Sequence, residues 1–479
     1  MTAMPDFSPA VPEIFMLIMI CTVLLVDVFL KPEQRNVTYV LAQASLVGAL
    51  ILTMASSGDE RILTFSDRFV RDPMGDVLKV FIYIITIGVF LYSRDYLKER
   101  GLFKGEYYVL GLFAVLGMMV MVSAHSFLTL YLGLELLSLS LYALVAFDRD
   151  NGQASEAAMK YFVLGALASG MLLYGMSIIY GLTGSLDISQ VHTQITTHAG
   201  EGQARLGALF GLSFIIVGIA FKLGAVPFHM WVPDVYHGAP TSVAMFVGTA
   251  PKIAAFAMVM RLLVEGMGSL HADWQQMLVL LAILSIGLGN VAAIAQTNIK
   301  RMFAYSTISH VGFILLGILA GTREGYASSM FYTLVYAITS LGGFGMILLL
   351  SRKGFEADEI EDFKGLNDRN PWYAFIFMIL LISMIGVPGT AGFIAKLSVL
   401  QAVIGVDRIG LAVFAVILSV VGAFYYLRVI KVMYFDKPED DVQLSSHTDV
   451  NIVLSANSLI ILLLGIFPNL LMSVCFASM

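Results

Sequence analysis

Residues 206–237 form an apolar stretch that is too long for one membrane-spanning helix. A continuous helix over this range would be about 48 Å long at about 1.5 Å per residue, whereas the hydrocarbon core of a bilayer is about 30 Å thick. The stretch contains Lys222, followed closely by Gly224 and Pro227. Because glycine and proline interrupt helices, we expect a broken helix here that holds a lysine near the middle of the membrane.

The composition places nearly the whole chain in lipid. Hydrophobic residues make up 58% of the 479 residues and charged residues only 13%, about half the charge of a soluble domain. We therefore expect an all-α polytopic membrane protein with one membrane domain over 1–479, and no nucleic-acid partner. Cys21 and Cys475 lie in apolar runs without a CxxC motif or a Cys/His cluster, so we expect no metal and no iron–sulfur centre.

Fourteen apolar runs are long enough to span a bilayer. They cover residues 11–30, 37–55, 73–92, 107–122, 126–146, 157–181, 206–237, 241–263, 275–296, 302–320, 327–351, 372–404, 408–430 and 449–474. The first run reads as a retained span, and 182–205 reads as an external loop. Most lysines and arginines outside the runs follow odd-numbered runs. The positive-inside rule then predicts that both termini lie on the periplasmic side.

A second overlong run, 372–404, repeats the features of the first. It contains Gly386, Pro388 and Gly389 shortly before Lys396. The two runs are the seventh and the twelfth, so they cross the membrane in opposite directions. Glycine- or proline-interrupted spans in corresponding positions are typical of inverted repeats that surround a transport path.

We therefore expect two inverted five-helix repeats, each with one discontinuous helix. The first repeat covers spans four to eight, residues 103–264. The second covers spans nine to thirteen, residues 273–434. Residues 449–474 then form a final transmembrane helix.

Four ionisable residues fall at similar depth inside the runs: Glu135, Lys222, Lys252 and Lys396. Each costs about 3 kcal/mol at the bilayer centre if unpaired, so they must face the protein interior or water. One acid cannot neutralise three lysines, and buried ion pairs add little net stability, which weakens a purely structural reading. A sodium site would need clustered oxygens. Lysines whose proton affinity is changed by burial and by a nearby carboxylate favour a proton relay.

The histidines and the remaining charges receive separate interpretations. His310 follows three hydroxyl residues in its run, so a relay role and a packing role are equally favoured. His229 and His237 read as structural residues near a proline-rich turn. Lys79 lies close enough to a span end to reach the interface. Lys300, at the edge of its run, is explained by topology, with gating as a secondary reading.

The chain resembles the antiporter-like membrane subunits of respiratory complex I over about residues 103–434. The resemblance rests on FKLGAVPFHMWVPDVYHGAPTSVAMFVGTAPK, on LELLSLSLYAL before it and on NIKRMFAYSTISHVGF after it. Similar chains occur in multisubunit sodium/proton antiporters and membrane-bound hydrogenases. The length, the absence of a long lateral helix at the C-terminal end, and a lysine at position 396 resemble one branch of the complex I subunits.

The resemblance implies roles for particular residues. The essential glutamate matches Glu135, the broken-helix lysine Lys222, the central lysine Lys252, the central histidine His310 and the terminal lysine Lys396. Protons would enter near Lys252 and Lys222, pass His310 and leave by Lys396, with Glu135 tuning Lys222 electrostatically.

The resemblance also implies partners and a location. NADH, FMN, iron–sulfur clusters and quinone would bind in partner subunits, with no cofactor in this chain. The partners would be neighbouring membrane subunits and a hydrophilic redox arm, in a bacterial inner membrane. Two other readings remain open, a subunit of a multisubunit sodium/proton antiporter and a scaffold subunit that conducts nothing.

Overall fold

The computed structural model describes residues 5–198, 202–351, 353–438 and 448–479, and these residues are almost entirely helical. Thirteen helices in this part of the chain are long and apolar enough to cross a membrane. Twelve of them are α1 (Val11–Phe29), α2 (Asn36–Ser56), α3 (Pro73–Glu99), α4 (Gly105–Val122), α5 (Phe127–Val145), α6 (Gly152–Thr183), α8 (Gly202–Leu223), α12 (His271–Ile294), α13 (Ile299–Leu319), α14 (Arg323–Leu350), α18 (Ile409–Phe435) and α19 (Thr448–Ile466). The thirteenth joins α10 (Thr241–Gly248), α11 (Ala250–Val259) and a π-helix, η3 (Met260–Gly266).

Shorter elements complete the fold. They are α7 (Ile188–His198), α9 (Trp231–Gly238), η5 (Ile360–Phe363), α15 (Leu366–Arg369), α16 (Pro371–Ile385), α17 (Ala391–Gly405), α20 (Asn469–Ser478) and a hairpin of β1 (Ile62–Thr64) and β2 (Phe69–Arg71). The pair α16–α17 supplies one more crossing beside the thirteen long helices. The predicted fold class, an all-α bundle of about fourteen spans, is confirmed.

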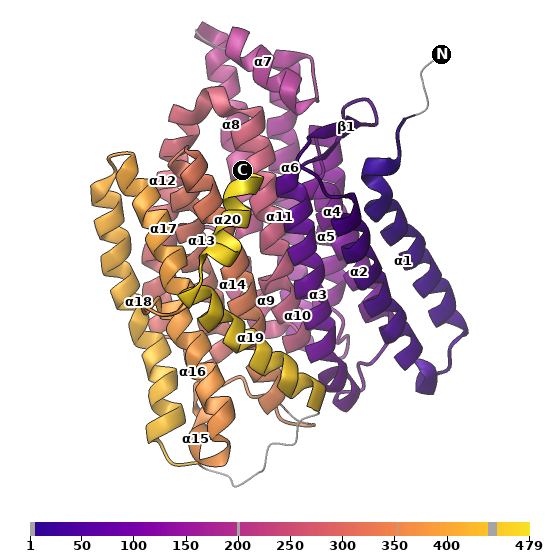
Figure 1. Cartoon of the computed structure of the whole chain (residues 1–479), viewed down its shortest axis with the longest axis vertical. Helices are drawn as coiled ribbons and strands as arrows, with labels where there is room; N and C mark the ends of the chain where they lie inside the picture. The colour runs from indigo at the N-terminus through magenta and orange to yellow at the C-terminus, as the bar shows by residue number, and fades with distance from the viewer. Residues whose placement is uncertain (1–4, 199–201, 352, 439–447) are drawn as a thin grey trace.

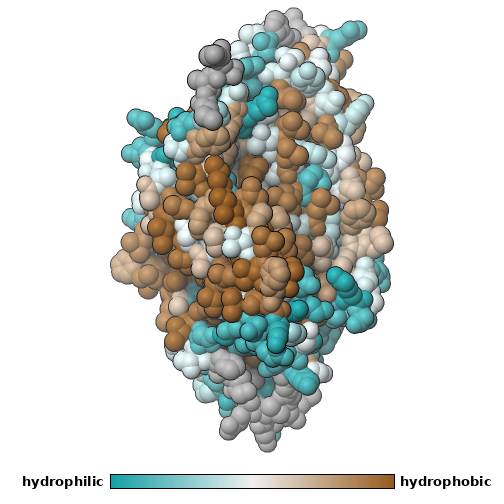
Figure 2. All heavy atoms as spheres, turned by 90° about the vertical axis from the view of Figure 1, so that its right-hand side faces the viewer, coloured by the Kyte–Doolittle hydropathy of each residue, from teal (hydrophilic) through white to brown (hydrophobic). Residues whose placement is uncertain are grey.

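The helices stand side by side in one bundle, and its surface has the pattern of a membrane protein (Figure 1). Helices α1–α3 form one side, α16 and α18 form the other, and α9, α10 and α13 lie between them. On the face drawn in Figure 2, hydrophobic side chains form a broad band between hydrophilic ends. We call the end with the β-hairpin and α7 the hairpin face, and the opposite end the α15 face.

Both predicted helix breaks are present. Helix α8 ends at Leu223, and α9 begins at Trp231. Helix α16 ends at Ile385, and α17 begins at Ala391. Gly224 and Gly386, which follow the first half-helix in each pair, have φ angles of +80° and +90°. This left-handed conformation is the one that glycine adopts at helix C-termini.

The run 241–263 is one span, Thr241–Gly266, with an interruption at Thr249 just before Pro251. Two sequence predictions are wrong in detail. The run 449–474 is two helices, since α19 ends at Ile466 and Pro468 precedes α20. Proline lacks an N–H and clashes with the preceding helical turn. The region 182–205 contains helix α7 in place of a simple loop.

Two connections on opposite faces are tied down in the same way. On the hairpin face, Ser126, between α4 and α5, forms a β-bridge with Asp187, which follows α6. On the α15 face, Asn298, between α12 and α13, forms a β-bridge with Glu359, which follows α14. In each case the segment that connects two consecutive helices pairs with the segment that follows the next helix of the chain.

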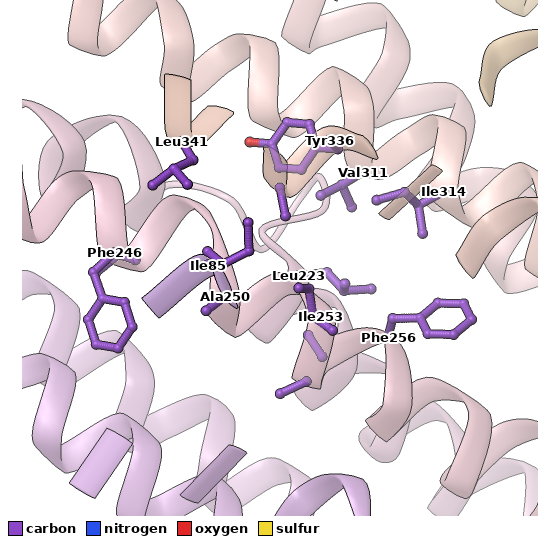
Figure 3. Close-up of a cluster of buried hydrophobic side chains, with 14 of the residues drawn as sticks. Ile85, Leu223, Phe246, Ala250, Ile253, Phe256, Val311, Ile314, Tyr336 and Leu341 are labelled. Carbon is purple, nitrogen blue, oxygen red and sulfur yellow. The ribbon is translucent and has the colours of Figure 1, made fainter. Parts of the chain in front are cut away.

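The first helix break is embedded in an apolar core. Leu223 at the end of α8 is 2% exposed. Figure 3 shows it in a cluster with side chains from α3, α10, α11, α13 and α14, among them Ile253 and Leu341. Burial of one such side chain is worth about 1.5–3 kcal/mol in water, and in lipid the same close packing holds helices together. The break is therefore a fixed feature of the core.

A buried arginine fastens α11 to α3 at the hairpin face. Arg261 in the π-helix is fully buried, and its Nη1 and Nη2 atoms lie 2.6 and 2.8 Å from the two carboxylate oxygens of Asp72. Arg261 also donates to the Val122 carbonyl and pairs with Glu265. Burial raises the pKa of the Asp72 carboxyl, but the Arg261 guanidinium outweighs this effect and holds it at about 2, below the usual 3.8.

We predict that Asp72→Asn lowers the stability of the protein by about 3 kcal/mol, because it leaves a buried guanidinium short of its counter-charge. The Asn side chain can still accept the capping hydrogen bond from the Gly75 amide, so the loss of stability measures the removal of the negative charge. Since the folded pKa lies below the unfolded one, the pair stabilises fully above about pH 4 and its contribution disappears as the pH falls through about 2. The measurement is thermal unfolding of the purified protein, and Asp67→Asn on the exposed hairpin turn is the matched control. Equal midpoints for the two variants would contradict the prediction.

Candidate functional site

The first break ends in a glycine-capped helix terminus that holds a lysine. The Gly224 amide donates to the carbonyls of Ala220 and Phe221, and the next amide donates to Ala220 as well. This is the pattern of a Schellman motif, which leaves the last carbonyl of the helix free to accept another donor. The donor is Lys252 of α11, whose Nζ lies 2.7 Å from the Leu223 carbonyl oxygen. Lys252 is 2% exposed.

The second break repeats this arrangement. The Gly386 amide donates to the carbonyls of Ile382 and Ser383, and the following amide donates to Ile382. The carbonyl of Ile385 accepts a hydrogen bond from Lys396 Nζ at 2.8 Å. Lys396 Nζ also donates to Ser419 Oγ of α18 at 2.8 Å.

The two lysines therefore occupy equivalent chemical positions, although they come from different helices. Each ammonium donates to the carbonyl of the residue just before a left-handed glycine, Leu223 or Ile385. The C-terminus of a helix carries about half a negative charge, so it stabilises an ammonium at membrane depth without a carboxylate. An aromatic ring flanks each ammonium as well, Trp231 at 5.3 Å and Phe313 at 5.1 Å.

A side chain at either glycine would clash with a neighbouring side chain, Val232 at the first break and Lys396 at the second. A Cβ atom on Gly224 would lie 2.7 Å from Val232 Cγ2 and 3.6 Å from Lys252 Nζ. A Cβ atom on Gly386 would lie 2.9 Å from Lys396 Cδ. Pro227 and Pro388 fall in the two non-helical segments that follow. Gly389 has a φ of +93° in the second segment.

Lys222 lies in the last turn of α8, next to the first break, and it contacts α5. Its Nζ donates to Ser138 Oγ at 3.1 Å. Glu135 is one helical turn away from Ser138 on α5, and its carboxylate accepts a hydrogen bond from Ser169 of α6. Glu135 and Lys222 form no direct ion pair among the described residues. The Ser138 hydroxyl lies on the helix face that joins them.

Small cavities adjoin this site and the site of His310. A cavity of about 20 Å³ is lined by Lys222, Ser138, Ser169 and other residues of α5, α6 and α8. Another of about 20 Å³ is lined by His310 and residues of α14, α16 and α17. Each is roomy enough for a water molecule and offers polar partners for it.

His310 is held by tyrosines. Its Nδ1 lies 2.7 Å from the Tyr332 hydroxyl, and its Nε2 lies 3.2 Å from the Tyr426 hydroxyl. Tyr426 in turn bonds to Ser306, one turn earlier on α13. The neighbouring Thr307 hydroxyl lies 2.7 Å from the hydroxyl of Tyr336, a residue labelled in Figure 3. His310 is thus embedded in a group of hydroxyls, each able to accept and to donate a proton.

The prediction for Lys79 is wrong, whereas Lys300 lies at the edge of its helix as predicted but is buried. Lys79 does not reach an interface, because it is 1% exposed and its Nζ lies 2.8 Å from the Glu13 carboxylate on α1. Lys300 is 4% exposed and lies between two carboxylates, Glu356 and Asp358. Sequence reasoning missed both partners, because Glu13 lies at the start of a span and Glu356 lies in a polar loop. Only tertiary packing brings them to these lysines.

The five predicted relay residues lie on five helices: Glu135 on α5, Lys222 on α8, Lys252 on α11, His310 on α13 and Lys396 on α17. A sixth helix, α18, completes the Lys396 site through Ser419. Lys222, Lys252 and His310 are 7%, 2% and 7% exposed. Glu135 and Lys396 remain partly exposed at membrane depth. No group of three or more metal-binding side chains is found in the described ranges.

Comparison with known proteins identifies the family. The family model described as "NADH:quinone oxidoreductase/Mrp antiporter, TM" matches residues 124–422, more than half of the chain. A protein named NADH-quinone oxidoreductase subunit N from Thioalkalivibrio sulfidiphilus is 65% identical over 469 residues, covering 98% of this chain and 97% of the relative. The protein of the same name from Nitrosomonas europaea is 56% identical, with the same coverage.

Solved structures agree with this relationship. A chain in the structure of respiratory complex I from Thermus thermophilus with bound aureothin superposes with a TM-score of 0.83 at 29% identity, covering 98% of this chain and 100% of that one. A chain of an archaeal membrane-bound sulfane sulfur reductase gives a TM-score of 0.85 at 24% identity and shares the fold. The chain therefore belongs to the antiporter-like membrane subunits of respiratory complex I, in the NADH-quinone oxidoreductase subunit N family.

Proposed function

We propose that this chain carries one proton path across the membrane, as a subunit of a redox-driven NADH:quinone oxidoreductase. Electrons pass from NADH to quinone in partner subunits, which hold the FMN and iron–sulfur centres, and this chain binds no cofactor. The path runs from Lys222 and Lys252 through His310 to Lys396, and Glu135 acts on Lys222 through its charge. Family membership supports the coupling to electron transfer, and the buried ionisable side chains support the path.

One observation carries this proposal. At each of the two helix breaks, the last carbonyl of the half-helix accepts a hydrogen bond from a lysine. A hydrogen bond to a charged group contributes about 1.5–3 kcal/mol, and the helix terminus adds up to about 2 kcal/mol in partly buried sites. These contributions offset much of the cost of burying an ammonium. Unlike an ion pair, this acceptor does not fix the charge state, because a neutral amine still has an N–H to donate. The sites of Lys252 and Lys396 can therefore hold a lysine in either state.

We infer that residues 103–264 and 273–434 form inverted repeats. Three observations support this reading. The two Schellman breaks correspond, the equivalent β-bridges lie on opposite faces, and the first two helices of each segment, α4–α5 and α12–α13, pack extensively as pairs. Inverted repeats give the path similar half-helix termini approached from the two sides of the membrane.

Partner subunits are needed to complete this membrane unit. Glu135 and Lys396 are partly exposed at membrane depth, where contact of a charge with lipid costs about 3 kcal/mol. We propose that neighbouring complex I membrane subunits cover these positions, and that the hydrophilic redox arm drives the path from a distance. The excess of basic residues in loops of the α15 face supports a bacterial inner membrane orientation with both termini in the periplasm.

We predict that Lys222→Met abolishes proton translocation by this chain while the complex still assembles. Methionine fills a similar volume without a charge, so packing is preserved, but no proton can be held beside Ser138. The measurement is NADH-driven proton uptake by the complex in proteoliposomes, expressed as protons per NADH oxidised. Lys31→Met, at an exposed position between α1 and α2, is the matched control and keeps the ratio unchanged.

Two outcomes of this experiment would refute the proposal. An unchanged ratio in an intact Lys222→Met complex would leave only the scaffold reading. Uptake of labelled sodium that depends on Lys222 and accompanies NADH oxidation would favour the sodium/proton antiporter reading instead.

We predict that Gly386→Ala slows proton uptake through this chain about tenfold. A left-handed backbone costs a residue with a side chain about 1–2 kcal/mol, and the new methyl group would displace Lys396 from the Ile385 carbonyl. A barrier increase of about 1.4 kcal/mol corresponds to a tenfold change in rate. Gly405→Ala at the far end of α17 meets no atom within 4 Å and serves as the control. Equal rates for the two variants would show that the break geometry does not matter.

A further inference from the structure

Lys300 occupies an unusual position on the α15 face. It lies in the first turn of α13, the helix that carries His310, yet its side chain is only 5% exposed. Its Nζ lies 4.0 Å from the Glu356 carboxylate and 3.9 Å from that of Asp358. Direct hydrogen bonds between nitrogen and oxygen are about 2.7–3.2 Å long. A separation near 4 Å is therefore too long for a direct hydrogen bond and is compatible with a bridging water.

The two carboxylates are presented by the segment between α14 and α15, and that segment is fixed. The Ile299 amide donates to the Asp358 carbonyl at 2.7 Å, and the Ile360 amide donates to the Thr297 carbonyl at 2.9 Å. Glu356 also accepts from Tyr96 of α3, pairs with Arg100 and bonds to Thr241 at the start of α10. Glu356 therefore lies beside the first turns of α10, which continues into the helix of Lys252, and of α13, which carries His310.

The cluster extends inward through α9. His237 at the end of α9 is half-buried and lies within electrostatic range of Lys300, Arg301, Asp358 and Glu359. The preceding residue, Tyr236, is fully buried, and its hydroxyl has no direct hydrogen-bond partner among the described residues, with Thr307 and Tyr336 in its surroundings. Successive residues of a helix point about 100° apart, so α9 presents one side chain to the cluster and the next to the hydroxyls around His310.

The hydroxyls continue toward His310 on α13. Thr307 bonds to Tyr336, and Ser306 bonds to Tyr426, which in turn contacts His310 Nε2. Lys300 is ten residues before His310, about 15 Å along the helix. Ser306 and Thr307 place two hydroxyls on α13 between Lys300 and His310.

We propose that Lys300, Glu356, Asp358 and His237 form a proton-collecting site on the α15 face, at the entry of the proposed path. This inference rests on the proposed proton-translocating function and places the site ahead of Lys222, Lys252 and His310 in the same series. The Lys300 ammonium gives one proton to the neutral imidazole of His237, which releases one proton to the path. The neutral amine then takes one proton from bulk water by way of Glu356 or Asp358, which restores the charge of the cluster.

A substitution by arginine distinguishes proton collection from a purely structural role. In the structural role, Lys300 would only supply the fixed positive charge that holds the 353–363 segment. Arginine keeps the positive charge and its attraction to Glu356 and Asp358, but a guanidinium does not release its proton in proteins. The experiment compares Lys300→Arg and Lys300→Met in the intact complex in proteoliposomes, after subunit composition has been checked. The exposed Lys431, ion-paired to Asp436 on the same face, provides the control Lys431→Arg.

We expect both Lys300 variants to lower protons taken up per NADH to the level of Lys222→Met, with Lys431→Arg unchanged. Normal pumping by Lys300→Arg would overturn the inference, whether or not Lys300→Met fails, because a fixed charge would then suffice. Lys222→Met is measured in the same series. If it stops translocation while the Lys300 variants do not, only this inference fails. If Lys222→Met pumps normally, the proposed function itself fails.

Discussion

The structure depends on the hydrogen bond between a lysine ammonium and the last carbonyl of a half-helix. A bilayer offers no water to satisfy the free end of a helix, and it penalises an unpaired ammonium. Bringing the two together satisfies both groups at once, Lys252 on Leu223 and Lys396 on Ile385. Each break therefore needs its lysine, and each lysine needs its break. The glycines that allow a left-handed turn are part of the same interaction.

Arginine and lysine have different tasks in this chain. Arg261 is completely buried, makes a two-pronged pair with Asp72 and also binds a backbone carbonyl. A guanidinium stays charged under all biological conditions, so this arrangement fixes the end of α11 against α3. The lysines at the breaks have backbone and hydroxyl partners that tolerate a change of charge. Permanent charge thus serves attachment at the hairpin face, and the lysines at the breaks have the partners that the proposed exchange of protons requires.

The sequence was informative wherever the physical constraint was local. Bilayer thickness and the Gly/Pro positions were enough to predict the breaks after Leu223 and Ile385, and the burial cost of charge was enough to select Glu135 and the three lysines. The interruption at Thr249 was not predicted, because a single proline is tolerated within a transmembrane helix. The partners of the charges were also missed. Ser138, Ser419, Glu13 and Glu356 are ordinary in their own segments, and only the packing of distant helices places them beside a lysine.

The central claim is that Lys252 and Lys396 serve one path in series, and a double substitution tests it most directly. Protons taken up per NADH would be measured for Lys252→Met, Lys396→Met and the variant that carries both, in complexes of normal composition. Residues that act as one unit are strongly non-additive. The account predicts that each single variant removes the whole contribution of this chain and that the double variant is no worse. Two partial losses that add up in the double variant would contradict it, because they would show two independent paths.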